Sequence, residues 1–254
     1  MTEPKPTIWC LHGTVGAATD WNGFRQSWEN AGYAFRAVDL WRFLDCCPRS
    51  LHETARALNA EVACQNGKNL LVGYSMGGRI ALHALLAAGS PWDRAVIVAA
   101  HPGLESEEEK IERRKRDADW SVRCHRDSWA DFLKEWQSQP ILQLLAGSQE
   151  AGLDRGPLHL RRKEISRSFL EWSLGVQENL WPHLGQIRVP LLWMTGELDL
   201  KFSALAQSAC ERIPHARALV MPAAGHRLPW QQPEKFSQEV LAFFSDSRME
   251  AYST

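Results

Sequence analysis

Short apolar runs alternate with amphipathic helical patterns along most of this chain, and this alternation restricts its fold more than any other feature. Each apolar run has the length and the side-chain types of a buried strand. The runs are Thr7–Leu11, Ala34–Val38, Asn69–Val72, Ala95–Ala99, Leu191–Met194 and Ala218–Met221. Because helices separate these strands, the sequence predicts an α/β fold with a mostly parallel sheet of about six strands, covered by helices.

The helical patterns predict the helices that cover the sheet, and they show one long stretch in which the alternation of strands and helices stops. Those between the strands are Trp21–Asn30, Leu51–Gln65, Met76–Ala88, Phe202–Arg212 and Pro233–Phe244. Residues 105–181 contain helical patterns but no strand, and Arg113 and Trp120 are almost two turns apart there, so they share a helical face. We therefore expect residues 1–104 and 182–254 to form the core and residues 105–181 to form an inserted helical cap.

Composition excludes several classes of protein. The formal net charge of −1 gives no basic surface for nucleic acid or anionic membrane. No apolar run is long enough to span a membrane, and the first residues lack the apolar segment of a signal peptide. The six cysteines are scattered without the spacing of a disulfide framework or a zinc site. We expect a cytoplasmic protein without metal or cofactor, whose oligomeric state the sequence does not indicate.

The segment Gly73-Tyr74-Ser75-Met76-Gly77 follows a predicted strand and precedes a predicted helix. This order of strand, Gly-x-Ser-x-Gly and helix is typical of a nucleophile elbow, a tight turn that exposes the serine. Glycines flank the serine because its neighbours approach the next helix closely. The alternative is a glycine-rich turn with an ordinary serine, so the partners of Ser75 decide the interpretation.

An elbow serine predicts an acid and then a histidine later in the chain. Asp199 follows the strand Leu191–Met194, and His226 follows the strand Ala218–Met221. The sequence therefore predicts a triad in which Asp199 orients His226 and His226 takes the proton of Ser75. Asp199 alone could instead cap a helix, a lone histidine is commonly structural, and Glu197 is a competing acid. We expect two backbone N–H groups to form an oxyanion hole, those of Met76 and Thr14. Thr14 is assigned only by its position after His12-Gly13.

These residues resemble the α/β-hydrolase family over nearly the whole chain, and within it the 2-succinyl-6-hydroxy-2,4-cyclohexadiene-1-carboxylate synthases of menaquinone biosynthesis. The elbow alone is typical of the wider family. The narrower resemblance rests on several segments that occur together: Leu11-His12-Gly13, the elbow extended to Arg79, His101-Pro102-Gly103-Leu104, Glu112-Arg113-Arg114, Phe132-Leu133-Lys134-Glu135-Trp136 with Gln139-Pro140, and Gly196-Glu197-Leu198-Asp199-Leu200-Lys201-Phe202.

The resemblance implies a lyase in which the triad, with Ser75 as the base, removes a proton from a small anionic polycarboxylate and triggers elimination of pyruvate. It implies that Arg79, Arg113 and Arg167 hold substrate carboxylates, and that Tyr74 and Trp136 line the pocket. Arginine suits this role because it binds carboxylates bidentately and keeps its charge. Arg79 could also be solvated, Arg113 could pair with Glu109 on its helix, and the register of Arg167 in its basic stretch is open.

Two departures from the family pattern are visible. The segment Asp39-Leu40-Trp41-Arg42-Phe43-Leu44 stands where many relatives have Asp-x-Pro-Gly-His-Gly, and it leaves the substrate open. The first predicted strand also begins at Thr7, so we expect the sheet to lack the antiparallel hairpin that usually precedes it in the family. Besides the lyase, the sequence is compatible with a serine hydrolase of a small ester, thioester or carbon–carbon bond, and with a non-catalytic binding protein.

Overall fold

A six-stranded sheet forms the centre of the computed structural model, which describes residues 4–142 and 153–246. The strands are β1 (Thr7–Leu11), β2 (Ala34–Val38), β3 (Asn69–Tyr74), β4 (Arg94–Val98), β5 (Leu191–Gly196) and β6 (Ala216–Met221). They run in the order β2-β1-β3-β4-β5-β6, and every neighbouring pair is parallel. The predicted parallel sheet is confirmed, with strand ends shifted by no more than two residues.

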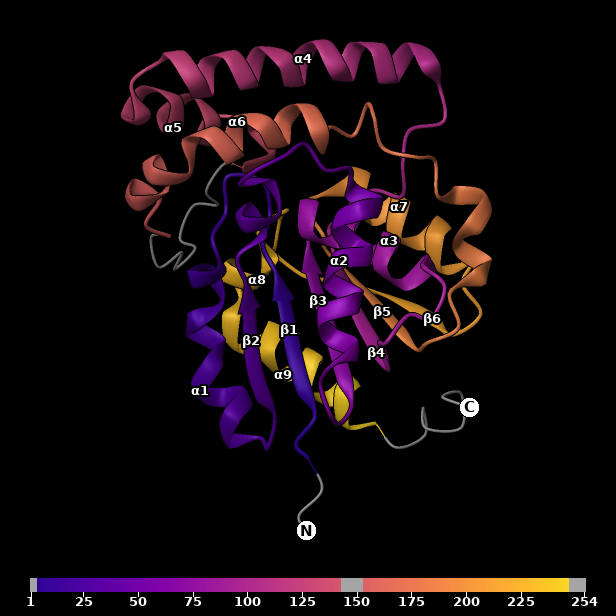
Figure 1. Ribbon diagram of the computed structural model, residues 1–254. Coiled ribbons are helices and arrows are strands. Elements are labelled where there is room, and N and C mark those ends of the chain that lie inside the picture. The colour runs from indigo at the N-terminus through magenta and orange to yellow at the C-terminus, as the bar shows by residue number, and fades with distance from the viewer. Residues whose placement is uncertain (1–3, 143–152, 247–254) are drawn as a thin grey trace.

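Alternate side chains of each strand enter two separate cores. Trp9 and Leu11 of β1 pack on the face covered by α2 (Leu51–Ala63), α3 (Met76–Leu86) and α7 (Leu200–Cys210). Ile8 and Cys10 pack on the opposite face, under α1 (Asn22–Asn30) and α9 (Pro233–Ser245). Figure 1 shows these helices on either side of the sheet. The central strands β1, β3, β4 and β5 are therefore buried on both faces, which is why they are mostly apolar, whereas the edge strands β2 and β6 are partly exposed.

The register of the parallel strands aligns their carboxyl ends along one edge of the sheet. Leu11, Gly73, Ile97 and Trp193 lie in one row across β1, β3, β4 and β5. The loops that follow these strands consequently begin at the same edge. In parallel α/β sheets this carboxyl edge is where ligands bind.

A helical layer lies over that edge (Figure 1). It contains α4 (Glu107–Arg126), α5 (Trp129–Gln137) and α6 (Arg162–Glu171), with short 3₁₀ turns η3 (Pro140–Leu142) and η4 (Gly156–Arg161). The chain returns to β5 through another 3₁₀ turn, η5 (Trp181–Gln186). The described residues between 105 and 181 contain helices and no strand, although the limits of the proposed cap remain a prediction.

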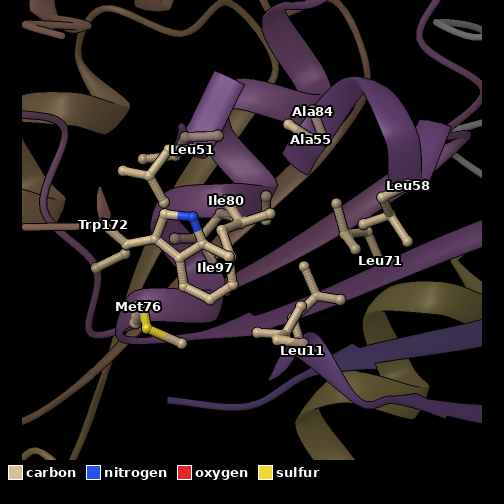
Figure 2. Close-up of a cluster of buried hydrophobic side chains, with 14 of the residues drawn as sticks. Leu11, Leu51, Ala55, Leu58, Leu71, Met76, Ile80, Ala84, Ile97 and Trp172 are labelled. Atoms are coloured by element: carbon tan, nitrogen blue, oxygen red, sulfur yellow. The ribbon is translucent and has the colours of Figure 1, made fainter. Parts of the chain in front are cut away.

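Tryptophan side chains join this helical layer to the core. Trp172, which directly follows α6, is 1% exposed. Figure 2 shows its indole beside Met76, Leu51 and Ile80 on the α2–α3 face of the sheet. Burial of so large an aromatic surface anchors the end of α6 on the first turn of α3.

Within the described part of the chain, no helix is both long enough and apolar enough to cross a membrane.

Candidate active site

Ser75 occupies a strained turn between β3 and α3. Its backbone has φ 51° and ψ −110°, a conformation that residues other than glycine rarely adopt. The turn is tight enough to need small neighbours, because a Cβ on Gly77 would lie 2.5 Å from the carbonyl oxygen of Leu11. A Cβ on Gly73 would lie 2.8 Å from the Cβ atom of Ala81. The elbow geometry thus follows from the Gly-x-Ser-x-Gly pattern.

The three residues of the predicted triad form a continuous chain of hydrogen bonds. The Oγ atom of Ser75 is 3.2 Å from Nε2 of His226, and Nδ1 of His226 is 2.7 Å from Oδ2 of Asp199. Asp199 and His226 are both buried, whereas Ser75 is partly exposed. With Nδ1–H donated to the carboxylate, Nε2 carries the free lone pair toward Ser75. This arrangement can move a proton from the serine hydroxyl to the imidazole.

Glu197, the competing acid, has a different position. Its side chain is exposed and accepts a hydrogen bond of 2.9 Å from the backbone N–H of Ala223, in the loop that carries His226. The two loops touch closely, because a Cβ on Gly196 would lie 2.2 Å from the carbonyl oxygen of Ala224. Glu197 therefore supports the histidine loop and does not contact the imidazole.

The loop after β1 lies beside Ser75, where an oxyanion hole requires it. A Cβ on Gly13 would lie 2.7 Å from the ring of Tyr74 and 3.5 Å from Cβ of Ser75, so Thr14 follows at the same place. Met76 begins α3, and its N–H belongs to the first turn, where backbone donors have no partner within the helix. Both predicted donors thus come from segments next to Ser75, and their role stays a prediction.

The unusual segment after β2 supports this loop. Residues Leu40–Leu44 form a 3₁₀ turn, η2, in which the indole N–H of Trp41 donates to the carbonyl of Gly16 over 2.8 Å. The fully buried His12 donates from Nδ1 to the carbonyl of Gly13 and accepts at Nε2 from the N–H of Leu40. Burial lowers the pKa of His12, which suits this neutral form. His12 is thus structural.

A small cavity lies next to the triad. Thr14, Tyr74 and Trp136 are among the residues that line it, and the predicted contact of Tyr74 and Trp136 with a substrate stays a prediction. The ring of Tyr74 is 5.7 Å from that of His226, so Tyr74 connects the cavity to the triad. Its buried hydroxyl has a raised pKa, because burial disfavours the phenolate.

Sequence reasoning missed an ion pair at this cavity. Arg155 pairs with Asp20, which also accepts the N–H of Ala17, and both charged side chains line the cavity with little exposure. The two residues are far apart in sequence and belong to no motif, so only their approach in the fold identifies them.

Arg79 and Arg113 form a second group of charges, beyond the elbow. Arg79 is 7% exposed, and burial, with Arg113 as a nearby like charge, lowers its pKa to about 9. Arg113 donates from Nε to both carboxylate oxygens of Asp117, at 2.8 and 2.9 Å, and does not form the alternative pair with Glu109. Burial is the main cause that lowers the pKa of His101, to about 3, and the positive charges of Lys201, Arg79 and Arg113 act in the same direction. These three basic side chains form a cationic cluster near His101, in which Asp117 is the carboxylate that pairs with Arg113.

Arg167 lies elsewhere on the same side of the molecule. It extends from α6 and donates to the carbonyl of Leu44 over 2.6 Å, at the end of η2. Its predicted contact with a substrate carboxylate remains a prediction.

Among the residues that the structure describes, no group of three or more His, Cys, Asp or Glu side chains is arranged to hold a metal ion.

Residues 10–239 match the family described as "Alpha/beta hydrolase family". A Salmonella paratyphi B protein named 2-succinyl-6-hydroxy-2,4-cyclohexadiene-1-carboxylate synthase is 27% identical over 90% of this chain and 89% of its own length. A Bacillus subtilis protein, provisionally given the same name, is 31% identical over 93% and 89%. These relatives confirm the resemblance that the motifs indicate.

Solved structures agree on the fold. MenH from S. aureus matches with a TM-score of 0.81 at 21% identity, covering 98% of this chain and 96% of that one. An esterase from Exiguobacterium antarcticum matches with a TM-score of 0.70 at 19% identity, covering 96% and 92%. The predicted α/β-hydrolase fold is thus confirmed, and it is shared by proteins with different names.

Proposed function

We propose that this chain, which belongs to the alpha/beta hydrolase family, is a lyase that eliminates pyruvate from 2-succinyl-5-enolpyruvyl-6-hydroxy-3-cyclohexene-1-carboxylate. The product would be 2-succinyl-6-hydroxy-2,4-cyclohexadiene-1-carboxylate, the compound in the names of the relatives. The observation that carries the proposal is the hydrogen-bonded triad together with a cationic cluster that a simple esterase would not need.

The triad can supply the base for this reaction. The ring proton next to the succinyl ketone is the acidic one, and Ser75 Oγ takes it while passing its own proton to Nε2 of His226. The electron pair of the broken C–H bond forms a ring double bond at C2, the existing double bond moves to C4, and the C–O bond to the enolpyruvyl group breaks. Asp199 stabilises the imidazolium, which then returns its proton to the pyruvate enolate.

Charge that develops on the ketone oxygen needs stabilisation. The backbone N–H groups of Met76 and Thr14 would serve as its donors, because both segments lie beside Ser75. Preorganised donors of this kind are worth far more in a closed site than in water. Tyr74 and Trp136 would form the wall of the pocket.

The cationic cluster suits the carboxylates of such a substrate. Arg79 is buried, and no ion pair within 4.0 Å joins it to a carboxylate among the described residues. A buried charge without a counter-ion is costly, and an anionic ligand would compensate for it. We also propose that Arg113 contributes to the same potential, and that the protein works in the cytoplasm without a nucleic-acid or membrane partner.

Pyruvate release from the open precursor tests the proposal. It can be followed by coupling to lactate dehydrogenase, with Arg79→Met and Arg113→Met as variants that should lose affinity for the substrate. No pyruvate at micromolar enzyme would refute the lyase.

A serine hydrolase is the second candidate, because the same triad serves ester cleavage and the fold matches an esterase. Turnover of a neutral ester that survives both arginine substitutions would favour it. A non-catalytic binding protein is the least supported, and labelling of Ser75 by a phosphonate would count against it.

A further inference from the structure

The guanidinium of Arg79 is held by two neutral acceptors. One N–H group donates to Oε1 of Gln177 over 3.0 Å, and another donates to the carbonyl of Trp172 over 2.6 Å. Neither partner carries charge, so these bonds fix the direction of the side chain without neutralising it. Among the described residues, the charge of Arg79 is therefore not neutralised by a paired carboxylate.

The carboxylate whose charge acts on Arg79, that of Asp117, is already bound by other side chains. Asp117 accepts both bonds from Nε of Arg113 and a further bond of 2.7 Å from the hydroxyl of Ser173, and its side chain is 5% exposed. Asp117 therefore compensates Arg113. Its charge acts on Arg79 only from a distance, where it favours the protonated guanidinium.

The amide of Gln177 is itself fixed from the other side. Its Nε2 donates to the carbonyl of His101 over 3.1 Å, and the residue is 3% exposed. Because the carbonyl of His101 needs a donor, the amide oxygen must face Arg79.

The backbone around Gln177 is equally constrained. The N–H of Leu180 donates to the carbonyl of Pro102, and a Cβ on Gly103 would lie 2.6 Å from the carbonyl oxygen of Glu178. The two segments that connect the helical layer to the core thus pack against each other at Gln177. This tight packing leaves the side chain little freedom to move away from Arg79.

We propose that Gln177 is a positioning residue for the anion site: its amide orients Arg79, and its neutrality leaves the guanidinium charge free for a substrate carboxylate. This inference rests on the proposed function only in taking the ligand of Arg79 to be a carboxylate. A glutamate at the same position would be an internal counter-ion. It would compete with the ligand in a buried site, where charge-assisted bonds are strong.

Three variants separate positioning from charge. Gln177→Glu keeps the shape and adds a negative charge, and Gln177→Met keeps the length but removes both hydrogen bonds. Gln186→Glu makes the same chemical change at an exposed site of η5, where the side chain forms a hydrogen bond with His183. Thermal melts and circular dichroism of each variant establish that it is folded.

The probe is succinate, whose binding is measured by titration calorimetry at low ionic strength. We expect wild-type protein and Gln186→Glu to bind equally, Arg79→Met to bind at least tenfold more weakly, and Gln177→Glu to match Arg79→Met. Gln177→Met should weaken binding by about threefold. The methionine leaves the charge of Arg79 unpaired but no longer orients its guanidinium. In the pyruvate assay, Gln177→Glu should raise KM while kcat changes less than threefold, a split that mere loss of folded protein would not produce.

Equal weakening in Gln177→Glu and Gln177→Met would overturn the role of charge, and wild-type affinity in both would overturn the whole inference. If Gln177→Glu does not fold, wild-type kcat/KM in Gln177→Met overturns the positioning role. Failure of wild-type protein to bind succinate also overturns the inference, even if pyruvate is released. Succinate binding that depends on Arg79 and Gln177 without any pyruvate release would instead refute only the proposed reaction.

Discussion

Replacing Asp199 with asparagine tests the proton path in the triad more sharply than removing the serine. The substitution preserves size and removes charge. The new amide would present either its carbonyl oxygen or its NH₂ group to Nδ1 of His226, which lies 2.7 Å from the carboxylate oxygen of Asp199. If the NH₂ group donates, Nδ1 becomes the acceptor and Nε2 carries the proton, so the imidazole cannot accept one from Ser75.

The expected loss can be worked out from the ion pair that forms during turnover. Once His226 is protonated, two opposite charges face each other in a buried pair, with side chains 5% and 7% exposed. At an effective dielectric constant of about 20 and a charge separation of about 4 Å, their attraction is worth roughly 4 kcal/mol. Since about 1.36 kcal/mol corresponds to a factor of ten, we expect kcat to fall about 10³-fold, and further where the wrong tautomer dominates.

The assay is pyruvate release under saturating substrate, or ester turnover if the hydrolase proposal holds. Glu197→Gln is the matched control, because it makes the same change two residues away on an exposed carboxylate that binds the N–H of Ala223. We expect this control to stay within about threefold of wild-type kcat, as exposed polar contacts contribute little. A loss below tenfold in Asp199→Asn, or an equal loss in the control, would refute the assignment of Asp199.

The same geometry leads to expectations for three other side chains. Ser75→Ala should lower kcat by at least about 10³-fold while the melting temperature stays within a few degrees, because the hydroxyl contributes chemistry and little packing; retained turnover would show that Ser75 is not the base. Trp172→Ala should lower the free energy of unfolding by about 3–5 kcal/mol in urea titrations, because the indole is 1% exposed beside Met76 and Leu51; a change below 1 kcal/mol would contradict this packing. Burial lowers the pKa of His83 from 6.5 to about 4. The unfolded chain therefore takes up a proton before the folded one does, and stability is fully present above pH 6.5 and is lost as the pH falls toward 4, by up to roughly 3 kcal/mol. His83→Gln should flatten the urea-denaturation profile over this range, and an unchanged slope would rule out His83 as its cause.

The partners of Arg113 and Trp120 in the helical layer could not be predicted from the sequence. Periodicity placed Arg113 and Trp120 on one face of a helix, and both lie on α4. It could not show that the guanidinium of Arg113 turns to Asp117, four residues along, or that Trp120 packs edge-on against Trp136. Spacing restricts which side chains share a face, but packing chooses among the partners within reach.

The sequence by itself determined the order of strands and helices, the parallel sheet and the positions of Ser75, Asp199 and His226 after their strands. These features depend on local periodicity and on a tight turn that only small flanking residues permit. Only the tertiary structure decided which polar side chains meet. Asp20 with Arg155, and Gln177 with Arg79, are 135 and 98 residues apart, and no local pattern records such contacts. They exist because burying two sheet faces brings distant segments together, and buried polar groups must then find partners wherever the fold provides them.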